Sequence, residues 1–206
     1  LKEHFDIKKA FYITTDRGHP CQEEVALLQA LSKDNIIITP TDHFGRMDIS
    51  FVEGVIDRKI AEGGIFLGLT LNAGTTMEYL VDDIEGVIAL RDKIQSQYSL
   101  DYKPLVHADA VLGWVWLFAE KIDSVTIHDK SVSPAVIGNV KKMYNQIRHL
   151  SLVDSMGFDF HKLGFAAYQS SFYLSKGANI SSIDDLSFGE LSPYKKTIEL
   201  SRGAQG

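Results

Sequence analysis

Residues 65–76, which read IFLGLTLNAGTT, decide the fold class of this chain. The first seven of them form a short apolar run that predicts a buried strand, and that strand leads into a Gly-Thr-Thr turn. Five more apolar runs have the same character, at residues 10–14, 35–39, 104–108, 152–156 and 165–174. The sequence therefore predicts six buried strands.

Between these runs lie four segments with helical periodicity, at residues 23–31, 49–60, 81–94 and 136–150. In the second segment, for example, Val52, Val55 and Ile56 share one helix face. Strands that alternate with such helices predict βαβ units and a mostly parallel sheet, in which ligands bind beyond the carboxyl ends of the strands. Residues 113–133 fit neither pattern, and we expect an insertion with a helical first half.

The composition is that of an ordinary globular protein. Of 206 residues, 45% are hydrophobic and 23% are charged, which excludes a disordered chain and predicts one domain, or one domain and a fragment of another. The net charge is -6 and no run of Lys and Arg exceeds a pair, so we expect a small-molecule or protein partner rather than nucleic acid or an anionic membrane.

The sequence also bears on the compartment. The longest apolar run, residues 111–119, is far shorter than the roughly 20 residues that cross a bilayer, so we expect no membrane segment. Cys21 is the single cysteine and forms no internal disulfide, which makes a reducing cytoplasm the default location. The chain opens at Leu1 without a signal peptide, and we expect it to be a piece of a longer protein.

Three short segments end or follow predicted strands and should meet at one edge of the sheet: residues 72–76, 107–110 and 159–162. His107 and Asp109, together with Asp159 and His161, are of the residue types that bind metals. The alternative for His107 is a strand-end histidine whose ring is hydrogen-bonded by backbone groups, which is the commoner situation for a lone histidine.

Lys162 and Asp109 suggest a different chemistry. Lys162 lies among apolar residues, and desolvation there would lower its pKa toward the neutral amine that forms imines; the alternative is a solvated lysine in a turn. Asp109 ends an apolar strand, so a carboxylate buried there needs a cation or a hydrogen-bond donor, and a protonated pyridine nitrogen is one such partner. Together with the Gly-Thr-Thr turn, these residues suit pyridoxal phosphate.

The motifs also resemble those of a known family. His4 to Ala10 (HFDIKKA), residues 73–76 (AGTT), Asp82, residues 107–110 (HADA) and residues 154–162 occur in the order and approximate spacing of the group II pyridoxal-phosphate-dependent amino-acid decarboxylases. That family includes the glutamate, aromatic amino acid, tyrosine and diaminobutyrate enzymes. The stretch at 46–49 and the insertion look like bacterial tyrosine decarboxylases, whereas residues 159–162 look like the diaminobutyrate branch, so the substrate stays open.

The resemblance implies an α/β fold, namely the central part of the large domain of a fold-type I pyridoxal-phosphate enzyme, with a mostly parallel sheet and flanking helices. It implies that residues 1–206 are a partial cofactor-binding large domain, with the N-terminal segment and the small C-terminal domain absent. The full-length protein is expected to be a homodimer with its active sites at the subunit interface.

The resemblance also implies roles for particular residues. Lys162 matches the lysine that holds the cofactor as an internal aldimine, Asp109 the partner of the pyridine nitrogen, and His4 the histidine that stacks on the ring. Thr75 matches the turn that borders the cofactor and the substrate carboxylate, and His161 the neighbour of the lysine. The expected catalytic residues are therefore Lys162, Asp109 and His4, and the expected cofactor-binding residues are these three with Thr75, His161 and Ala110.

Three positions depart from the family pattern. Val111 stands where a small alanine is usual under the ring, and Phe160 replaces the usual proline before the histidine. Asp159 stands where many members have an asparagine near the phosphate, and its charge would repel a phosphate unless the carboxyl is protonated or turned away. Residues 176–192, where several members carry a tyrosine proton donor, contain no tyrosine, so no proton donor is assigned.

The implied function is decarboxylation of an L-amino acid, with release of CO2 and an amine. Two alternatives remain. The first is another fold-type I reaction, such as aminotransfer or desulfuration, which would use the same lysine and aspartate. The second is a non-catalytic homologue that has kept the fold.

Overall fold

The computed structural model describes residues 6–28, 31–122, 126–127, 130–164, 166 and 168–176. Residues 1–5, which include the predicted site residue His4, lie outside the described part of the chain. So do residues 177–192, which are nearly all of the segment where a proton donor was sought. The helices and strands discussed below belong to one compact unit that ends at Ser175.

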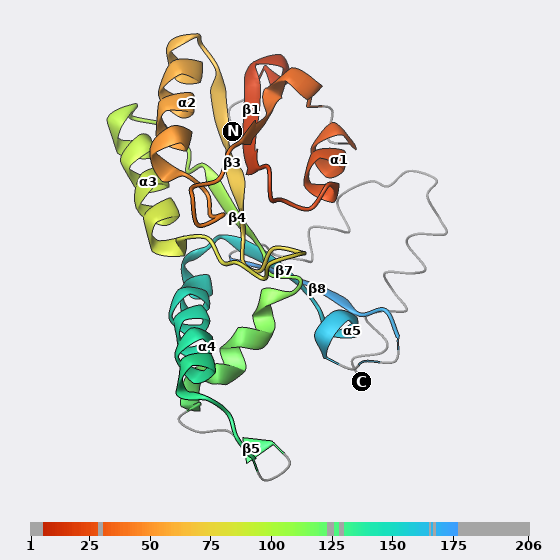
Figure 1. The fold of residues 1–206 in the computed structure, drawn as a ribbon. Coiled ribbons are helices and arrows are strands. Elements are labelled where there is room, and N and C mark those ends of the chain that lie inside the picture. The colour runs from red at the N-terminus through yellow and green to blue at the C-terminus, as the bar shows by residue number, and fades with distance from the viewer. Residues whose placement is uncertain are drawn as a thin grey trace. The chain divides into compact units, whose positions relative to one another are not determined.

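A six-stranded sheet forms the centre of this unit (Figure 1). Its spatial order is β2-β1-β3-β4-β7-β8, and all neighbouring pairs are parallel except β7 and β8. The strands are β1 (Ala10–Thr15), β2 (Ile36–Thr39), β3 (Ile65–Asn72), β4 (Leu105–Asp109), β7 (Ser155–Asp159) and β8 (Ser171–Ser175). The other two strands, β5 (Thr126–Ile127) and β6 (Lys130–Ser131), form a short separate hairpin.

The α-helices are α1 (Cys21–Leu28), α2 (Ile49–Ala61), α3 (Ile84–Gln97), α4 (Pro134–Ile147) and the single turn α5 (Phe160–Leu163). The 3-10 helices are η1 (Ile7–Lys9), η2 (Lys33–Asn35), η3 (Gly113–Lys121) and η4 (Arg148–Leu152). Side-chain caps begin three of the long helices, because Asp48, Asp83 and Ser133 each accept a hydrogen bond from the backbone N–H three residues later. Such caps each stabilise a helix by about 1 kcal/mol.

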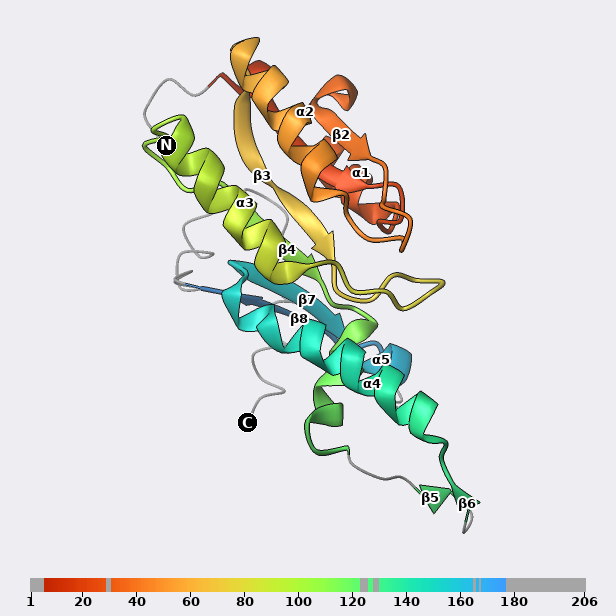
Figure 2. The ribbon, with the colours of Figure 1, turned by 60° about the vertical axis from the view of Figure 1, so that its left-hand side comes forward.

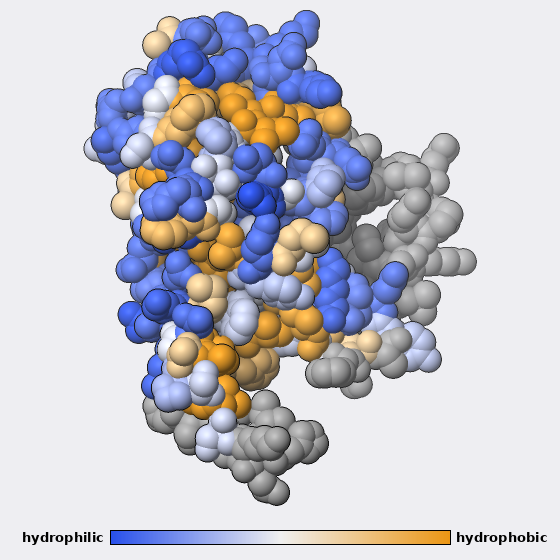
Figure 3. All heavy atoms as spheres, viewed as in Figure 1, coloured by the Kyte–Doolittle hydropathy of each residue, from blue (hydrophilic) through white to orange (hydrophobic). Residues whose placement is uncertain are grey.

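Helices α2, α3 and α4 cover one face of the sheet, and Figure 2 shows them side by side in front of the strands. The main core lies between these helices and the strands, with residues such as Phe66 and Val87 fully buried. Their outer surfaces are hydrophilic, while apolar patches occupy the middle of the view in Figure 3.

Strand β4 shows how the two faces of the sheet differ. Val106 and Ala108 point toward the covering helices and are fully buried. Leu105, His107 and Asp109 alternate with them and so point to the opposite face, where Leu105 is 61% exposed. A groove of about 510 Å³ runs along that face.

Two carboxylates, the buried Asp82 and the partly buried Asp154, tie loops to the sheet. Asp82 accepts hydrogen bonds of 2.6 Å from the backbone N–H groups of Met47 and Asn72. Burial raises the pKa of Asp82 to about 6, against the lowering effect of those two donors. The carboxylate thus joins the end of β3 to the loop that precedes α2.

The second carboxylate, Asp154, lies directly before β7. It accepts hydrogen bonds from Arg91 Nη1 at 2.8 Å, Lys103 Nζ at 3.0 Å and the Val106 N–H at 2.9 Å. Burial alone would raise the pKa of Asp154, but the Val106 N–H and the two cations outweigh it and lower that pKa.

The predicted alternation of strands and helices is confirmed, with shifts at the ends of elements. The strand expected at 152–156 begins only at Ser155, because residues 148–152 continue α4 as a 3-10 helix. The strand expected at 165–174 is wrong in length and occupies Ser171–Ser175. The insertion does have a helical first half, η3, but its hydrogen bonding is that of a 3-10 helix. Within the part of the chain described, no helix is both long and apolar enough to cross a membrane.

Candidate active site

A pocket of about 170 Å³ lies at the carboxyl edge of the sheet. It brings together all three of the segments that follow strands β3, β4 and β7, together with the loop that follows β1. The lining residues are Arg17, His19, Cys21, Asn72, Gly74, Thr75, Thr76, Asp109, Val111, Leu112, Asp159 and Lys162. The predicted residues Lys162, Asp109 and Thr75 therefore share one pocket.

Asp109 is the last residue of β4 and lies level with Asn72 on β3 and Gly157 on β7. Its Oδ2 accepts a hydrogen bond of 2.9 Å from Gln22 Nε2, and its Oδ1 accepts a longer one of 3.3 Å from the Val111 N–H. Both donors are neutral, and among the residues that the structure describes Asp109 has no ion pair. Within the described part of the chain, the carboxylate thus has hydrogen-bond donors but no paired cation.

Gln22 was not anticipated from the sequence, yet it holds Asp109 in place. Its side chain is buried at the start of α1, its Nε2 also lies 3.4 Å from Asn72 Oδ1, and its Oε1 accepts a hydrogen bond from the Thr14 hydroxyl. Asn72 is fixed in turn, because its Nδ2 donates to Thr15 Oγ1 at 2.8 Å. A signal was available, namely a glutamine in the first helical turn after a buried strand.

Tyr12 lines the same groove of the sheet as Asp109, and the charge of Asp109 affects its pKa. Burial is the main cause that raises the pKa of Tyr12 to about 12; a hydrogen bond with Thr70 opposes it, and the negative charge of Asp109 adds to it. The Tyr12 phenol therefore stays protonated. The pKa of the Cys21 thiol is also raised, chiefly by burial and then by the charge of Asp109.

Lys162 lies on α5, and the group that faces its amine is a carboxylate. Lys162 Nζ is 3.3 Å from Oδ2 of Asp159, whose side chain is only 10% exposed. Trp114 Nε1 donates to the Asp159 carbonyl oxygen at 3.0 Å, which anchors the backbone at the end of β7. Of the two settings considered for Lys162, the structure supports the more solvated one, because its side chain is 38% exposed and paired with Asp159.

His161 lies behind the pocket rather than in its lining. The Ser170 N–H donates to His161 Nδ1 at 3.1 Å, so in the neutral ring the proton is on Nε2. That nitrogen is 3.6 Å from Asp159 Oδ2. Asp159 therefore faces both His161 and Lys162, and it lines the pocket together with Lys162.

The histidine that lines the pocket is His19, whereas the predicted His4 lies outside the described residues. The Cys21 N–H donates to His19 Nδ1 at 3.2 Å, so the neutral ring carries its proton on Nε2. Sequence reasoning missed His19, although it stands in a short loop between a buried strand and a helix. Ala110 is fully buried and is not among the lining residues, but its neighbour Val111 is.

Two glycines bring the β3 and β4 turns into contact. A β-carbon on Gly113 would lie 1.8 Å from the Ala73 carbonyl oxygen, and one on Gly74 would lie 2.4 Å from the Gly113 nitrogen. Gly74 also has a positive φ of 120°, which other residues rarely adopt. Backbone contact between these turns holds Thr75 next to the end of β4.

The metal alternative receives no support from the side chains described. They contain no group of three or more His, Cys, Asp or Glu residues arranged to hold a metal ion. His107 instead makes a 2.8 Å hydrogen bond between Nδ1 and Ser155 Oγ and stacks on Tyr173. Its partner is thus a side chain rather than the expected backbone groups, and burial lowers the pKa of His107.

The groups in the pocket fit part of pyridoxal phosphate. A lysine amine suits its aldehyde carbon, and a carboxylate with no cation suits a protonated ring nitrogen. The volume of about 170 Å³ is below the roughly 300 Å³ at which ligand sites usually start, so the described residues form only part of such a site.

Comparison with known proteins agrees with the motifs. An L-tyrosine decarboxylase of Enterococcus faecalis is 30% identical over 183 residues, which are 83% of this chain and 28% of that protein. The chain therefore spans less than a third of the length of the Enterococcus faecalis enzyme. No family model matches the chain.

Solved structures show the same fold. Mouse CSAD has a TM-score of 0.62 at 19% identity, over 84% of this chain and 31% of that one. The glutamate decarboxylase domain of a diaminobutyrate-pyruvate transaminase and L-2,4-diaminobutyrate decarboxylase from Vibrio parahaemolyticus has a TM-score of 0.61 at 18% identity, over 82% of this chain and 30% of that one. The predicted fold class and the resemblance to the group II decarboxylases are confirmed.

Proposed function

We propose that this chain, which is similar in sequence and fold to the group II pyridoxal-phosphate-dependent amino-acid decarboxylases, is part of the cofactor-binding large domain of such an enzyme. The reaction is decarboxylation of an L-amino acid, with release of CO2 and an amine. One observation carries the proposal: Asp109, a carboxylate with neutral hydrogen-bond donors and no ion pair among the described residues, shares a pocket with Lys162.

When bound, pyridoxal phosphate supplies the electron sink that weakens the bonds to the α-carbon of an amino acid. Asp109 would favour a protonated ring nitrogen, because the attraction between unit charges is roughly 4 kcal/mol at about 4 Å and an effective dielectric constant near 20. Gln22 and the Val111 N–H keep that carboxylate pointed into the pocket.

Lys162 provides the amine that binds the cofactor covalently. When its amine is free, Asp159 is positioned to hold the ammonium form at 3.3 Å. His19 lines the pocket, whereas His4 lies outside the described residues, and His19 would take the ring-stacking role that the resemblance first suggested for His4. Thr75 supplies a hydroxyl at the rim.

We propose that the whole protein is longer than this chain. The L-tyrosine decarboxylase relative is more than three times as long as the matched part, which leaves room for phosphate contacts and a small domain. We further propose that the full-length protein is a cytoplasmic homodimer whose partner molecules are small amino acids. The tyrosine decarboxylase similarity makes L-tyrosine the first substrate to test.

The test is release of CO2 by the full-length protein, loaded with pyridoxal phosphate, from L-tyrosine, L-glutamate and L-2,4-diaminobutyrate. We expect one of these to release CO2 and form the matching amine. Transfer of the amino group to a keto acid without CO2 would favour aminotransfer instead. No turnover in any assay, with the fold intact, would favour a non-catalytic homologue.

A further inference from the structure

The rim of the pocket already holds a carboxylate, that of Glu78. Its Oε1 is paired with Arg17 Nη1, and its Oε2 accepts a hydrogen bond of 3.2 Å from the Thr75 hydroxyl. Arg17 and Thr75 both line the pocket, whereas Glu78 does not. Two residues that line the pocket thus donate to a carboxylate that comes from outside its lining.

We propose that Arg17 and Thr75 form a carboxylate-binding subsite, which Glu78 fills in the resting protein and which a carboxylate of the amino-acid substrate takes over. This inference rests on the proposed function, because it assigns a group of that substrate to this rim. Arg17 becomes a specificity-determining residue in this scheme, and Glu78 an internal competitor.

The Thr75 hydroxyl is oriented as a donor. Its oxygen accepts a hydrogen bond of 3.1 Å from the Leu80 N–H, which leaves its own proton to point elsewhere, and the proton points to Glu78. Thr75 is 3% exposed, so it is already desolvated and needs an acceptor for that proton. An incoming carboxylate would meet a hydroxyl that requires no reorientation.

The turn from Thr75 to Leu80 directs Glu78 back to the rim. The Tyr79 N–H donates to the Thr75 carbonyl at 3.0 Å, and the Thr75 N–H donates to the Leu80 carbonyl at 2.9 Å. Tyr79 has a φ of 58°, a left-handed conformation that costs a residue other than glycine energy. The turn is therefore closed by a strained residue directly after Glu78.

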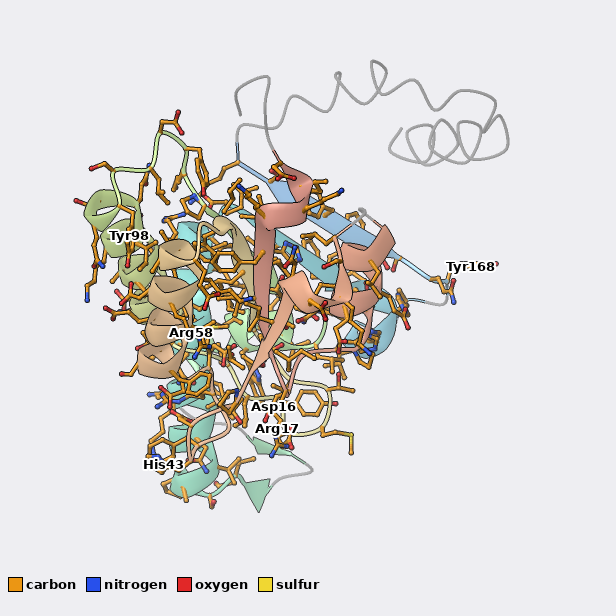
Figure 4. The ribbon with its side chains drawn as sticks, turned by 90° about the horizontal axis from the view of Figure 1, so that it is seen from above. Asp16, Arg17, His43, Arg58, Tyr98 and Tyr168 are labelled. Atoms are coloured by element: carbon orange, nitrogen blue, oxygen red, sulfur yellow. The ribbon has the colours of Figure 1, made fainter. Side chains whose placement is uncertain are left out.

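The Arg17–Glu78 pair is weak enough to exchange. The two side chains are 47% and 39% exposed, and ion pairs with that much solvent contribute little net stability. Arg17 lies beside Asp16 in the loop that follows β1, as Figure 4 shows, and so can turn without disturbing the sheet. Lys162 is the other Lys or Arg side chain in the lining, and it is paired with Asp159.

The chemistry favours a carboxylate over the phosphate of a cofactor. A planar guanidinium suits a planar anion, and the present occupant uses its two oxygens on two separate donors. A substrate could offer either its α-carboxylate or an acidic side chain, and these two sources are separated by the kinetic arm of the test.

The first arm measures binding of glutarate to the full-length protein by calorimetry, without substrate. Glu78→Gln removes the competitor and should tighten glutarate binding roughly threefold, the size of an exposed ion pair. Arg17→Gln should weaken it about tenfold or more, and Arg17→Lys should restore part of the loss. The matched control is Arg58→Gln, an exposed arginine on α2 that Figure 4 labels, and it should bind glutarate like the parent protein.

The second arm measures KM and kcat for whichever amino acids release CO2. A rise in KM on Arg17→Gln for acidic and neutral substrates alike identifies the α-carboxylate, and a rise confined to acidic substrates identifies the side chain. Glutarate binding equal in Arg17→Gln, Glu78→Gln and the parent would overturn the subsite, even if CO2 release is normal. A loss of pyridoxal-phosphate affinity in Arg17→Gln, with glutarate binding unchanged, would overturn it in favour of a phosphate contact.

Absence of CO2 release from every amino acid would contradict the proposed function alone, because the calorimetric arm needs no turnover. The subsite would then be judged by glutarate binding.

Discussion

The two edges of the sheet each carry a carboxylate, and the edges differ in what surrounds it. At the amino edge, Asp154 accepts hydrogen bonds from Arg91, Lys103 and a backbone N–H. At the carboxyl edge, Asp109 accepts hydrogen bonds from Gln22 and a backbone N–H. The first carboxylate is neutralised by cations within the fold, whereas the second has only neutral donors among the residues described.

The difference separates a stabilising role from a binding role. A buried carboxylate costs several kcal/mol unless it is paired and hydrogen-bonded, so Asp154 is compensated within the chain. Asp109 has its hydrogen bonds but leaves room for a positive partner in the pocket. We therefore expect changes at Asp154 to affect stability and changes at Asp109 to affect chemistry.

The largest effect is expected from Lys162→Ala in the full-length protein. Without its amine the cofactor has no covalent anchor on this chain, so turnover should be abolished. Borohydride reduction followed by peptide mapping should place the label on Lys162 in the parent protein. A label on Lys176, an exposed lysine in the same part of the sequence, would contradict the assignment.

The paired variants Asp109→Asn and Asp154→Asn test the comparison directly. Asp109→Asn should slow CO2 release by orders of magnitude while the free energy of unfolding changes little, because an amide cannot balance a positive ring nitrogen. Asp154→Asn should lower the free energy of unfolding by about 2 kcal/mol, because it weakens the charged hydrogen bonds of Asp154 and leaves buried Arg91 with Asp92 as its remaining carboxylate partner. Urea unfolding and turnover per folded molecule give both readouts, and the reverse pattern would refute the division of roles.

The pH dependence of stability tests two carboxylates with structural roles, Asp154 at the amino edge and Asp82 beside the end of β3. The pKa of Asp154 is lowered in the folded state, so its contribution is present above about pH 4 and is lost as the pH falls further. Asp82 behaves in the opposite way, because its pKa rises to about 6 on folding. Its contribution is complete below about pH 4 and declines by up to about 3 kcal/mol as the pH rises through 6.

Urea unfolding of the parent, Asp154→Asn and Asp82→Asn between pH 3 and pH 7 measures these slopes. In Asp154→Asn, the free energy of unfolding should no longer fall as the pH drops below about 4. In Asp82→Asn, it should no longer decline as the pH rises from about 4 to 6. Identical profiles in the parent and Asp82→Asn would show that this carboxyl titrates alike in the folded and unfolded chain.

The smallest effect is expected from Gln22→Leu, which removes one of the two donors to Asp109. A hydrogen bond to a charged group contributes about 1.5–3 kcal/mol, so turnover should fall about tenfold or more. The pH dependence of the visible absorption of bound cofactor should also shift, which a purely structural loss would not produce. Gln97→Leu, at an exposed position at the end of α3, is the matched control.

Sequence patterns were sufficient for the sheet because strands and helices have different periods. The apolar run at 65–71 and the amphipathic pattern at 49–60 correspond closely to β3 and α2. The run at 165–174 predicted too long a strand, because an apolar run does not by itself show where a strand begins, and β8 occupies only Ser171–Ser175.

The site was predicted in part, for a physical reason. Lys162, Asp109 and Thr75 each follow or end a strand, and parallel strands bring such positions to one edge. His19, Gln22 and Asp159 act through contacts between residues far apart in the sequence, such as the 2.9 Å bond from Gln22 to Asp109. A one-dimensional pattern does not contain those pairings, and the motif that pointed to His4 lies outside the described residues.

The contact between Gly74 and Gly113 has a practical consequence for engineering. Because the chain cannot carry a side chain at Gly113 without striking the Ala73 carbonyl, the backbone leaves the pocket at a fixed point. A design that alters the chain after Gly113 should therefore retain this glycine, so that the turn after Asp109 keeps its position. A side chain at either glycine would separate the turns after β3 and β4 and so change the shape of the pocket that they line.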